Sequence, residues 1–302
     1  MTQAAAHSAN AAARERLSRL PRPALWAIAA RLKTVSLSLT PVLAGTWWAA
    51  QAGLWRADVA LVAMISASAI QIGTNLWNDA ADAERGVDRA DRLGPPRLTS
   101  LGLLGAGEVR RAALAAFGVA ALAGLYLSAI GGWPIIGIGL VSLALGYLYS
   151  MGPRPMSGQP FGEALVIAFF GLVAVSGTAW LQGAAPLSPA LLALGLMIGL
   201  PAAAVLMLNN HRDRVQDARA GRRTLAIVIG ETGARVFYFA ALLAALGLAG
   251  MIAPSPWLVG PAILALWLGH AMWHWPVSAR LNALLGQTAL YQFLLLLAVT
   301  LG

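Results

Sequence analysis

Two groups of aspartate and asparagine residues, each at the end of a long apolar stretch, are the part of this sequence that points to chemistry. The first group is Asn75, Asn78, Asp79 and Asp82, and the second is Asn209, Asn210, Asp213 and Asp217. Because successive residues of a helix turn by about 100°, the members of each group fall on one helix face. Ionised carboxylates at the end of a membrane span are costly unless a cation or a partner compensates them.

Carboxylate and amide oxygens are hard ligands, and they suit Mg²⁺, which binds through a few carboxylates together with waters and substrate phosphates. We therefore predict a divalent-metal site. Its ligands are expected to be Asn75, Asp79, Asp82, Asp213 and Asp217, and the four aspartates are also the expected catalytic residues. The many arginines around the two groups suggest that the metal holds a phosphate ester.

The alternative is that these acids pair with nearby arginines and only solvate loops. The repeated Asn-x-x-x-Asp spacing, at 75/79 and at 209/213, argues against that alternative for the four aspartates. It stays open for three other acids that lie among Arg85, Arg89 and Arg92, namely Glu84, Asp88 and Asp91.

Long apolar runs must position these residues. The chain has 302 residues, of which 59% are hydrophobic and 11% charged, so we predict an all-α polytopic membrane helical bundle. Hydropathy gives nine transmembrane helices, at 25–51, 57–78, 109–130, 133–150, 161–183, 187–210, 232–253, 256–275 and 284–302. Residues 1–22 are expected to form a disordered cytosolic tail, and residues 23–302 a single domain. The chain has no cysteine, which excludes disulfides and thiolate sites.

The charges divide sharply between the two sides of such a bundle. If the N-terminus and the connections after the second, fourth, sixth and eighth spans share one side, that side holds every Lys and Arg except Arg56. It also holds every acid except Asp58. The positive-inside rule places this side, with both aspartate groups, in the cytoplasm, as in a bacterial-type cytoplasmic (inner) membrane. The net charge of +9 thus reports orientation and anionic ligands rather than nucleic acid.

Small residues are frequent in the predicted spans, for example Gly137 and Gly139, or Gly195 and Gly199. They either let helices pack closely or leave room for a long apolar ligand, and the sequence leaves both uses open.

The two aspartate motifs resemble those of the UbiA superfamily of membrane prenyltransferases. Asn209-x-x-x-Asp213-x-x-x-Asp217 matches the second motif of that family, and Asn78-Asp79-x-x-Asp82 matches the start of the first. The runs Arg31–Thr34, Arg92–Arg97 and Ala220–Ala226 are similar to the branch that prenylates 1,4-dihydroxy-2-naphthoate. Gly86, Ala80 and Ala81 depart from the usual pattern of the first motif, which bears on the identity of the acceptor.

The resemblance implies Mg²⁺-dependent transfer of a polyprenyl group from its diphosphate to an aromatic acceptor, with membrane lipid as the surroundings. In the naphthoate branch the substituted carbon also loses its carboxylate as CO₂. Alternatives within the family are 4-hydroxybenzoate, homogentisate, quinolone and haem as acceptors. From another class, an ion-coupled transporter would also hold acids in the membrane, but near its midplane rather than at helix ends.

Substrate contacts are expected mainly from basic residues, because guanidinium groups fork onto phosphate oxygens. Tyrosines are expected to face the allylic cation, whose charge an aromatic ring stabilises. The expected substrate-binding residues are Arg31, Lys33, Asn78, Arg92, Arg97, Tyr147, Tyr149, Arg154, Asn209, Arg222 and Arg223. For each basic residue the alternative is an anchor that contacts lipid phosphates.

Overall fold

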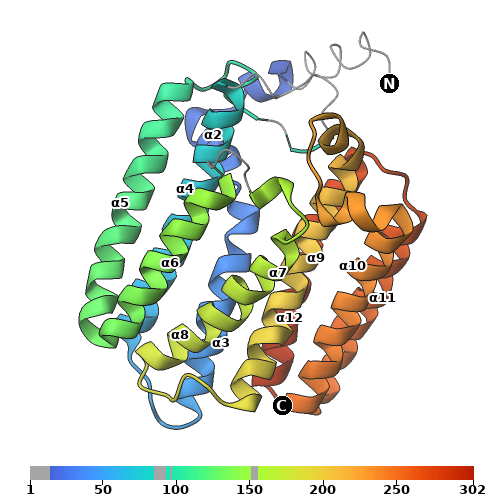
Figure 1. The fold of residues 1–302 in the computed structure, drawn as a ribbon. Coiled ribbons are helices and arrows are strands. Elements are labelled where there is room, and N and C mark those ends of the chain that lie inside the picture. The colour runs from blue at the N-terminus through green and yellow to red at the C-terminus, as the bar shows by residue number, and fades with distance from the viewer. Residues whose placement is uncertain (1–13, 85–92, 96, 151–155) are drawn as a thin grey trace.

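The computed structural model describes residues 14–84, 93–95, 97–150 and 156–302, and in these residues it contains helices and no strand. Within these ranges the side chains of Lys33, Leu143, Asp82 and Ser157, and those of residues 145–150, are not described. The helices form a bundle in which most elements run roughly along one direction (Figure 1).

Helices account for most of the described residues. They are α2 (Arg22–Ala29), α3 (Ser36–Ala50), α4 (Ala57–Glu84), α5 (Ala106–Gly131), α6 (Trp133–Ser150), α7 (Gly162–Val166), the π-helical η3 (Ile167–Val173), α8 (Ala174–Leu181), α9 (Pro189–Arg219), α10 (Leu225–Ile252), α11 (Val259–His274) and α12 (Asn282–Thr300). Four short 3₁₀ turns join them, η1 (Leu32–Thr34), η2 (Met156–Gly158), η4 (Pro256–Leu258) and η5 (Ala279–Leu281).

Each predicted span lies mostly in helix in the described residues, and the all-α membrane architecture is confirmed. In the described part of the chain, six helices are long and apolar enough to cross a membrane; they begin at Ala57, Ala106, Gly162, Pro189, Leu225 and Ala279. The α3 and α11 helices have 15 and 16 residues, which is shorter than a typical span of about 20. The count of nine transmembrane helices therefore stays a prediction.

The first predicted span, 25–51, is interrupted. It consists of α2, the turn η1 and α3, and Arg31 at the junction has a left-handed backbone with φ of 51°. Non-glycine residues rarely adopt this conformation, so surrounding contacts must hold it. The α10 helix has a similar break just before the seventh predicted span, 232–253, since Gly230 at φ 73° separates the first turn of α10 from the rest of the helix.

The α9 helix forms the centre of the bundle. It is extensively buried and packs against α10, η3 and α12. Its crossing with η3 is made by glycines, because a Cβ on Gly171 would lie 2.5 Å from the carbonyl oxygen of Gly195 and 2.9 Å from the Cα of Gly199. Small residues allow this backbone contact, which fixes how α7 and η3 lie along α9.

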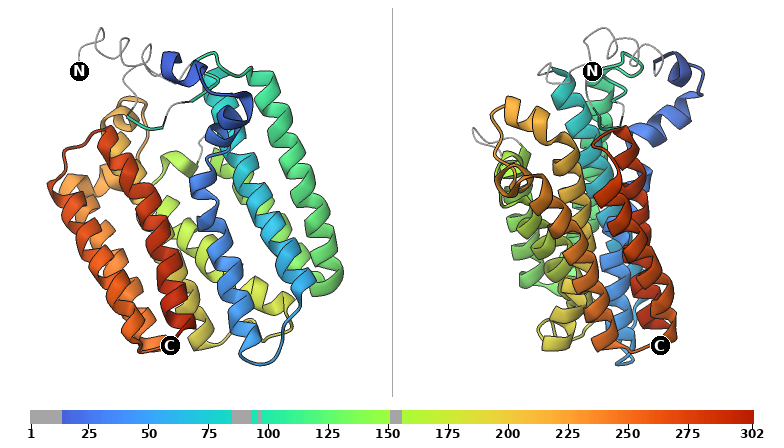
Figure 2. Two further views of the ribbon diagram at one scale, coloured as in Figure 1. Left: turned by 180° about the vertical axis from the view of Figure 1, so that it is seen from behind. Right: turned by 90° about the vertical axis from the view of Figure 1, so that its right-hand side faces the viewer.

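Both aspartate-bearing helices, α4 and α9, end at the same end of the bundle, where α2, the start of α12 and the connection after α4 also lie (Figures 1 and 2). The chain ends after α12 at the opposite end. Residues 14–18 are helical, and Leu17 is buried against a cluster that includes Leu25 and Leu98. The predicted disorder of residues 1–22 thus remains a prediction only for residues 1–13, which lie outside the described residues.

Candidate functional site

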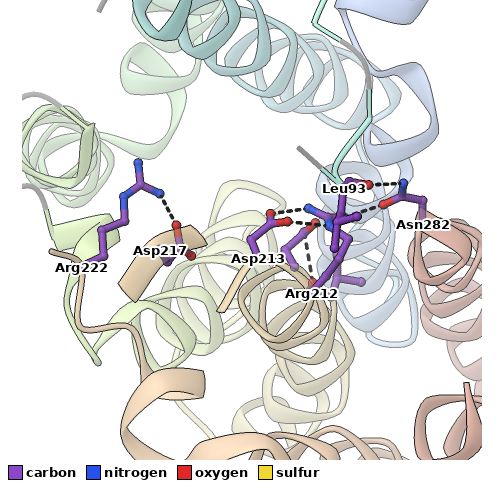
Figure 3. A network of polar contacts seen from close by, with 8 residues as sticks. Leu93, Arg212, Asp213, Asp217, Arg222 and Asn282 are labelled. Carbon is purple, nitrogen blue, oxygen red and sulfur yellow. Dashed lines mark hydrogen bonds and ion pairs between the residues drawn. The ribbon is translucent and has the colours of Figure 1, made fainter. Parts of the chain in front are cut away.

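The second aspartate motif lies on one continuous helix. Ser188 caps α9, its Oγ accepting from the Leu191 amide at 3.1 Å, and Pro189 occupies the first turn, where proline is tolerated. The helix then runs to Arg219, beyond the predicted end of the span at residue 210. Asp213 and Asp217 are therefore one turn apart on α9, as predicted (Figure 3).

Asp213 is held by its neighbour Arg212. The guanidinium forks onto the carboxylate, with Nε donating to Oδ1 at 2.9 Å and Nη2 to Oδ2 at 2.6 Å. The remaining Nη1 donates to Asn282 Oδ1 at 2.6 Å, at the start of α12. Asn282 Nδ2 in turn donates to the Leu93 carbonyl at 2.9 Å (Figure 3). Arg212 is only 3% exposed, so this buried cation has its charge balanced by Asp213.

Asp217 has a different arginine as its partner. Arg222 Nη1 donates to Asp217 Oδ1 at 3.0 Å across the turn that follows α9 (Figure 3). Gly221, with φ of 75°, makes this turn possible, and the Arg222 amide also donates to the Asp217 carbonyl at 3.0 Å. Arg223 is exposed, and its amide donates to the Gly158 carbonyl at 2.7 Å. The turn thus places two predicted substrate-binding arginines beside the second motif.

The first motif is covered by the connection after α4. Asp79 is 3% exposed, and its Oδ1 accepts a hydrogen bond of 2.5 Å from Thr99 Oγ1. Arg97 Nη1 donates to the Asn78 carbonyl at 2.5 Å. The described part of this connection therefore contacts the first motif at residues 97–99.

Asn75 points toward the break in the first predicted span. Its Nδ2 donates to the Ala30 carbonyl at 3.0 Å and to Thr34 Oγ1 at 3.2 Å, and Thr34 Oγ1 donates to the Arg31 carbonyl at 2.9 Å. These bonds connect α4 to the residues on either side of the left-handed turn at Arg31. Asn209, in contrast, donates back to the Val205 carbonyl of its own helix at 3.2 Å. The ligand role of Asn75 stays a prediction.

Several predicted site residues lie outside the described part of the chain. Arg92 and Arg154 are not described at all. For Lys33, Asp82, Tyr147 and Tyr149 only the backbone is described, in η1, α4 and α6. Their predicted roles are therefore carried forward as proposals.

The structure adds site residues that the sequence reasoning had missed. Arg212 and Thr99 contact motif aspartates directly, and Asn282 contacts Arg212. The buried Glu163 of α7 also accepts from Asn210 Nδ2 at 2.8 Å, one turn before Asp213. The sequence could have indicated only Arg212, because it directly precedes Asp213. Thr99, Glu163 and Asn282 are distant in the sequence from the residues that they contact.

The donor set fits a hard divalent cation. Asp79, Asp213 and Asp217 supply carboxylate oxygens at one end of the bundle, and each oxygen of Asp213 keeps a lone pair beyond the one that faces Arg212. The described side chains contain no group of three or more His, Cys, Asp or Glu residues close enough to hold a metal by themselves.

Several curated proteins with similar sequences are named 1,4-dihydroxy-2-naphthoate octaprenyltransferase. The chain is 37% identical to the 1,4-dihydroxy-2-naphthoate octaprenyltransferase of Mycobacterium tuberculosis, over 78% of this chain and 80% of that protein. It is 34% identical to the protein of the same name from Escherichia coli, over 85% of this chain and 81% of that protein.

Solved structures share the fold at low sequence identity. A UbiA homologue from Aeropyrum pernix K1 superposes with a TM-score of 0.64 at 15% identity, over 86% of this chain and 94% of that one. A UbiA homologue from Archaeoglobus fulgidus bound to DMAPP and Mg²⁺ gives 0.55 at 14% identity, over 90% and 98%. The model of the UbiA prenyltransferase family matches residues 38–298, and with two aspartate motifs at one end of a helical bundle the chain belongs to that family.

Proposed function

We propose that this protein transfers a polyprenyl group from its diphosphate to 1,4-dihydroxy-2-naphthoate, with loss of CO₂. The observation that carries the proposal is the pair of aspartate motifs on α4 and α9, which end at the same end of the bundle. The choice of acceptor is supported by the shared name of relatives at 37% and 34% identity over most of their lengths.

The aspartates have the task of holding Mg²⁺ against the diphosphate. Asp79, Asp82, Asp213 and Asp217 are the proposed carboxylate ligands, with Asn75 as a further ligand. Mg²⁺, when bound, supplies Lewis-acid stabilisation of the negative charge that develops on the leaving diphosphate. The Mg²⁺ bound to the Archaeoglobus fulgidus homologue supports this choice of metal.

The basic residues complete the diphosphate site. Arg222 is the best placed, because its side chain is about half exposed and already lies beside Asp217. Arg31, Lys33, Arg92, Arg97, Arg154 and Arg223 are the other proposed cationic contacts, and Asn78 and Asn209 the proposed amide contacts. A fork of guanidinium nitrogens matches the phosphate oxygens in geometry and charge.

The acceptor ring reacts as the allylic cation separates from diphosphate. The ring carbon that bears the carboxylate forms the new C–C bond, the C–O bond to diphosphate breaks, and the carboxylate then leaves as CO₂ and restores the aromatic ring. Tyr147 and Tyr149, on α6, are the proposed aromatic faces for the cation.

The proposed site faces the cytoplasm of a bacterial-type inner membrane. This orientation rests on the charge division, since Arg56 alone among the Lys and Arg residues belongs to the other side. A site on this side would release the soluble diphosphate product into the cytoplasm.

A direct assay tests the function. Purified protein is incubated with Mg²⁺, farnesyl diphosphate and carboxyl-labelled 1,4-dihydroxy-2-naphthoate, alongside 4-hydroxybenzoate and a quinolone. The expected result is a prenylated naphthalene product with release of labelled CO₂. Transfer to either competitor with no naphthoate product would reject the acceptor and leave prenyl transfer standing.

A further inference from the structure

We propose that Asn282 and Arg212 are positioning residues that join the two aspartate motifs into one diphosphate site. The inference rests on the proposed function and deepens it, because it names residues other than the motif aspartates and asparagines that control Mg²⁺-dependent binding of the prenyl diphosphate. It begins from a chain of hydrogen bonds that joins α9, the start of α12 and the connection after α4 (Figure 3).

Asn282 has two contacts that need opposite hydrogen-bonding groups. Its Oδ1 accepts from Arg212 Nη1 at 2.6 Å, and its Nδ2 donates to the Leu93 carbonyl at 2.9 Å. Among side chains of this length only an amide offers an acceptor and a donor side by side. Aspartate at this position would keep the bond from Arg212 and place a negative charge against the Leu93 carbonyl.

Arg212 carries the connection to Asp213. It is almost fully buried, and its Nε and Nη2 hold both oxygens of the carboxylate. A fork of this kind fixes the plane of the carboxylate while leaving the second lone pair of each oxygen for another cation. Arg212 therefore orients Asp213 for a metal rather than competing with it.

The connection after α4 closes the link to the first motif. Leu93 contacts Asn282, while a few residues later Thr99 donates to Asp79 Oδ1 and Arg97 to the Asn78 carbonyl. Arg97 and Thr99 thus contact the first motif directly, and Leu93, on the same stretch, contacts the second through Asn282 and Arg212. Displacing this stretch moves both sets of carboxylates relative to each other, so the site assembles as one unit.

Binding of an unreactive substrate analogue tests the link. Farnesyl S-thiolodiphosphate is titrated into purified full-length protein with and without Mg²⁺, and its Kd is measured calorimetrically. Asn282→Asp is expected to weaken Mg²⁺-dependent binding about tenfold, the effect of losing one buried hydrogen bond. In turnover it is expected to raise KM for the prenyl diphosphate and leave KM for the naphthoate unchanged.

Ser278→Ala is the matched control. Ser278 lies on the connection between α11 and α12, four residues before Asn282, and its Oγ accepts from the Arg280 amide at 3.3 Å. None of its printed hydrogen bonds belongs to the chain of bonds that leads to Asp213. Its loss is expected to lower thermal stability and leave the Kd of the analogue unchanged. Asn282→Leu removes both contacts and is expected to weaken binding further than Asn282→Asp.

The outcomes separate this inference from the function on which it rests. A wild-type Kd in Asn282→Asp, or an equal loss of affinity in Ser278→Ala, overturns the positioning role. If the wild-type protein itself does not bind the analogue in Mg²⁺, the prenyl-diphosphate function is rejected, and this inference with it. A different aromatic acceptor would leave the inference untouched.

Discussion

Arginine side chains compensate motif aspartates on α9. Asp213 pairs with Arg212 and Asp217 with Arg222, and on α4 Asp79 accepts a hydrogen bond from Thr99. The pairing of acids with arginines and the binding of a metal were alternatives in the sequence. In the structure they are compatible, because a partly buried carboxylate requires a cation before the ligand arrives and retains lone pairs for a metal afterwards.

Removing the charge of one motif aspartate is expected to abolish transfer. We predict that Asp79→Asn and Asp213→Asn each lower kcat by roughly 10³-fold or more, because each loses charge stabilisation of the leaving diphosphate worth several kcal/mol. Asparagine keeps the shape and avoids leaving Arg212 beside a cavity. The measurement is product formation per folded protein in membranes.

Glu84→Ala is the control for the aspartate variants. Glu84 lies at the same end of α4 and pairs with Arg110 of α5 in a contact that is substantially exposed. Exposed ion pairs contribute little, so near-normal turnover is expected. Near-normal turnover in Asp213→Asn as well would contradict the two-motif site.

Metal removal is a second test of the same carboxylates. Excess EDTA is expected to stop transfer, and added Mg²⁺ to restore it. Ca²⁺ is expected to restore less, because its larger, flexible shell does not match a compact octahedral bridge to diphosphate. Full turnover in EDTA would remove the metal from the mechanism.

Helix crossings decide where the motifs lie, and the glycines of α9 and η3 show how. A Cβ at Gly171 would meet the backbone of α9 at 2.5 Å, whereas at Gly139 of α6 no described atom lies within 4 Å of such a Cβ. The first glycine is a packing residue, and the second lies in open space on a helix with many exposed side chains.

The same substitution should therefore have opposite consequences in the two helices. Gly171→Ala is expected to force η3 away from α9 and to lower the unfolding temperature in detergent by several degrees, since overpacking costs typically about 1–3 kcal/mol. Gly139→Ala is expected to be neutral or to stabilise by up to about 1 kcal/mol through helix propensity. Equal unfolding temperatures for the two variants would contradict this prediction, because they would mean that η3 and α9 can move apart with no loss of stability.

Charged residues are unevenly distributed between the two sides of the molecule in the predicted topology. At the end opposite the aspartate motifs, Arg56 and Asp58 pair with each other at 2.7 Å, and Tyr126 donates to Asp58 at 2.6 Å. Every other charged residue of the chain belongs to the side of the motifs in the predicted topology. That division is the basis for placing the site in the cytoplasm.

Cysteine labelling tests this orientation, and the absence of native cysteine makes single-site labelling clean. A cysteine at the exposed Ala220, after α9, is expected to react with an impermeant reagent only from the cytoplasm. One at Trp55, which is 52% exposed between α3 and α4, is expected to react only from outside. Reaction of a cysteine at position 220 with the reagent outside intact cells would contradict the predicted orientation.

The sequence by itself determined the helical segments, the aspartate motifs and the family. Each of these rests on local information. Hydropathy defines the apolar segments, and the spacing of Asp213 and Asp217 places them one turn apart on a helix. Neither feature depends on which other helices pack against these segments. The pattern of charged connections added the predicted orientation.

The tertiary structure decided what depends on contacts between distant residues. It showed that Gly195 and Gly199 allow close packing of α9 against η3. It also showed that the first predicted span is interrupted at Arg31, next to the Ala30 carbonyl that accepts a hydrogen bond from Asn75. It also brought Asn282 to Arg212, 70 positions away in the chain. No periodicity encodes such pairs, because a hydrogen bond between separate helices exists only once packing has fixed their register and separation.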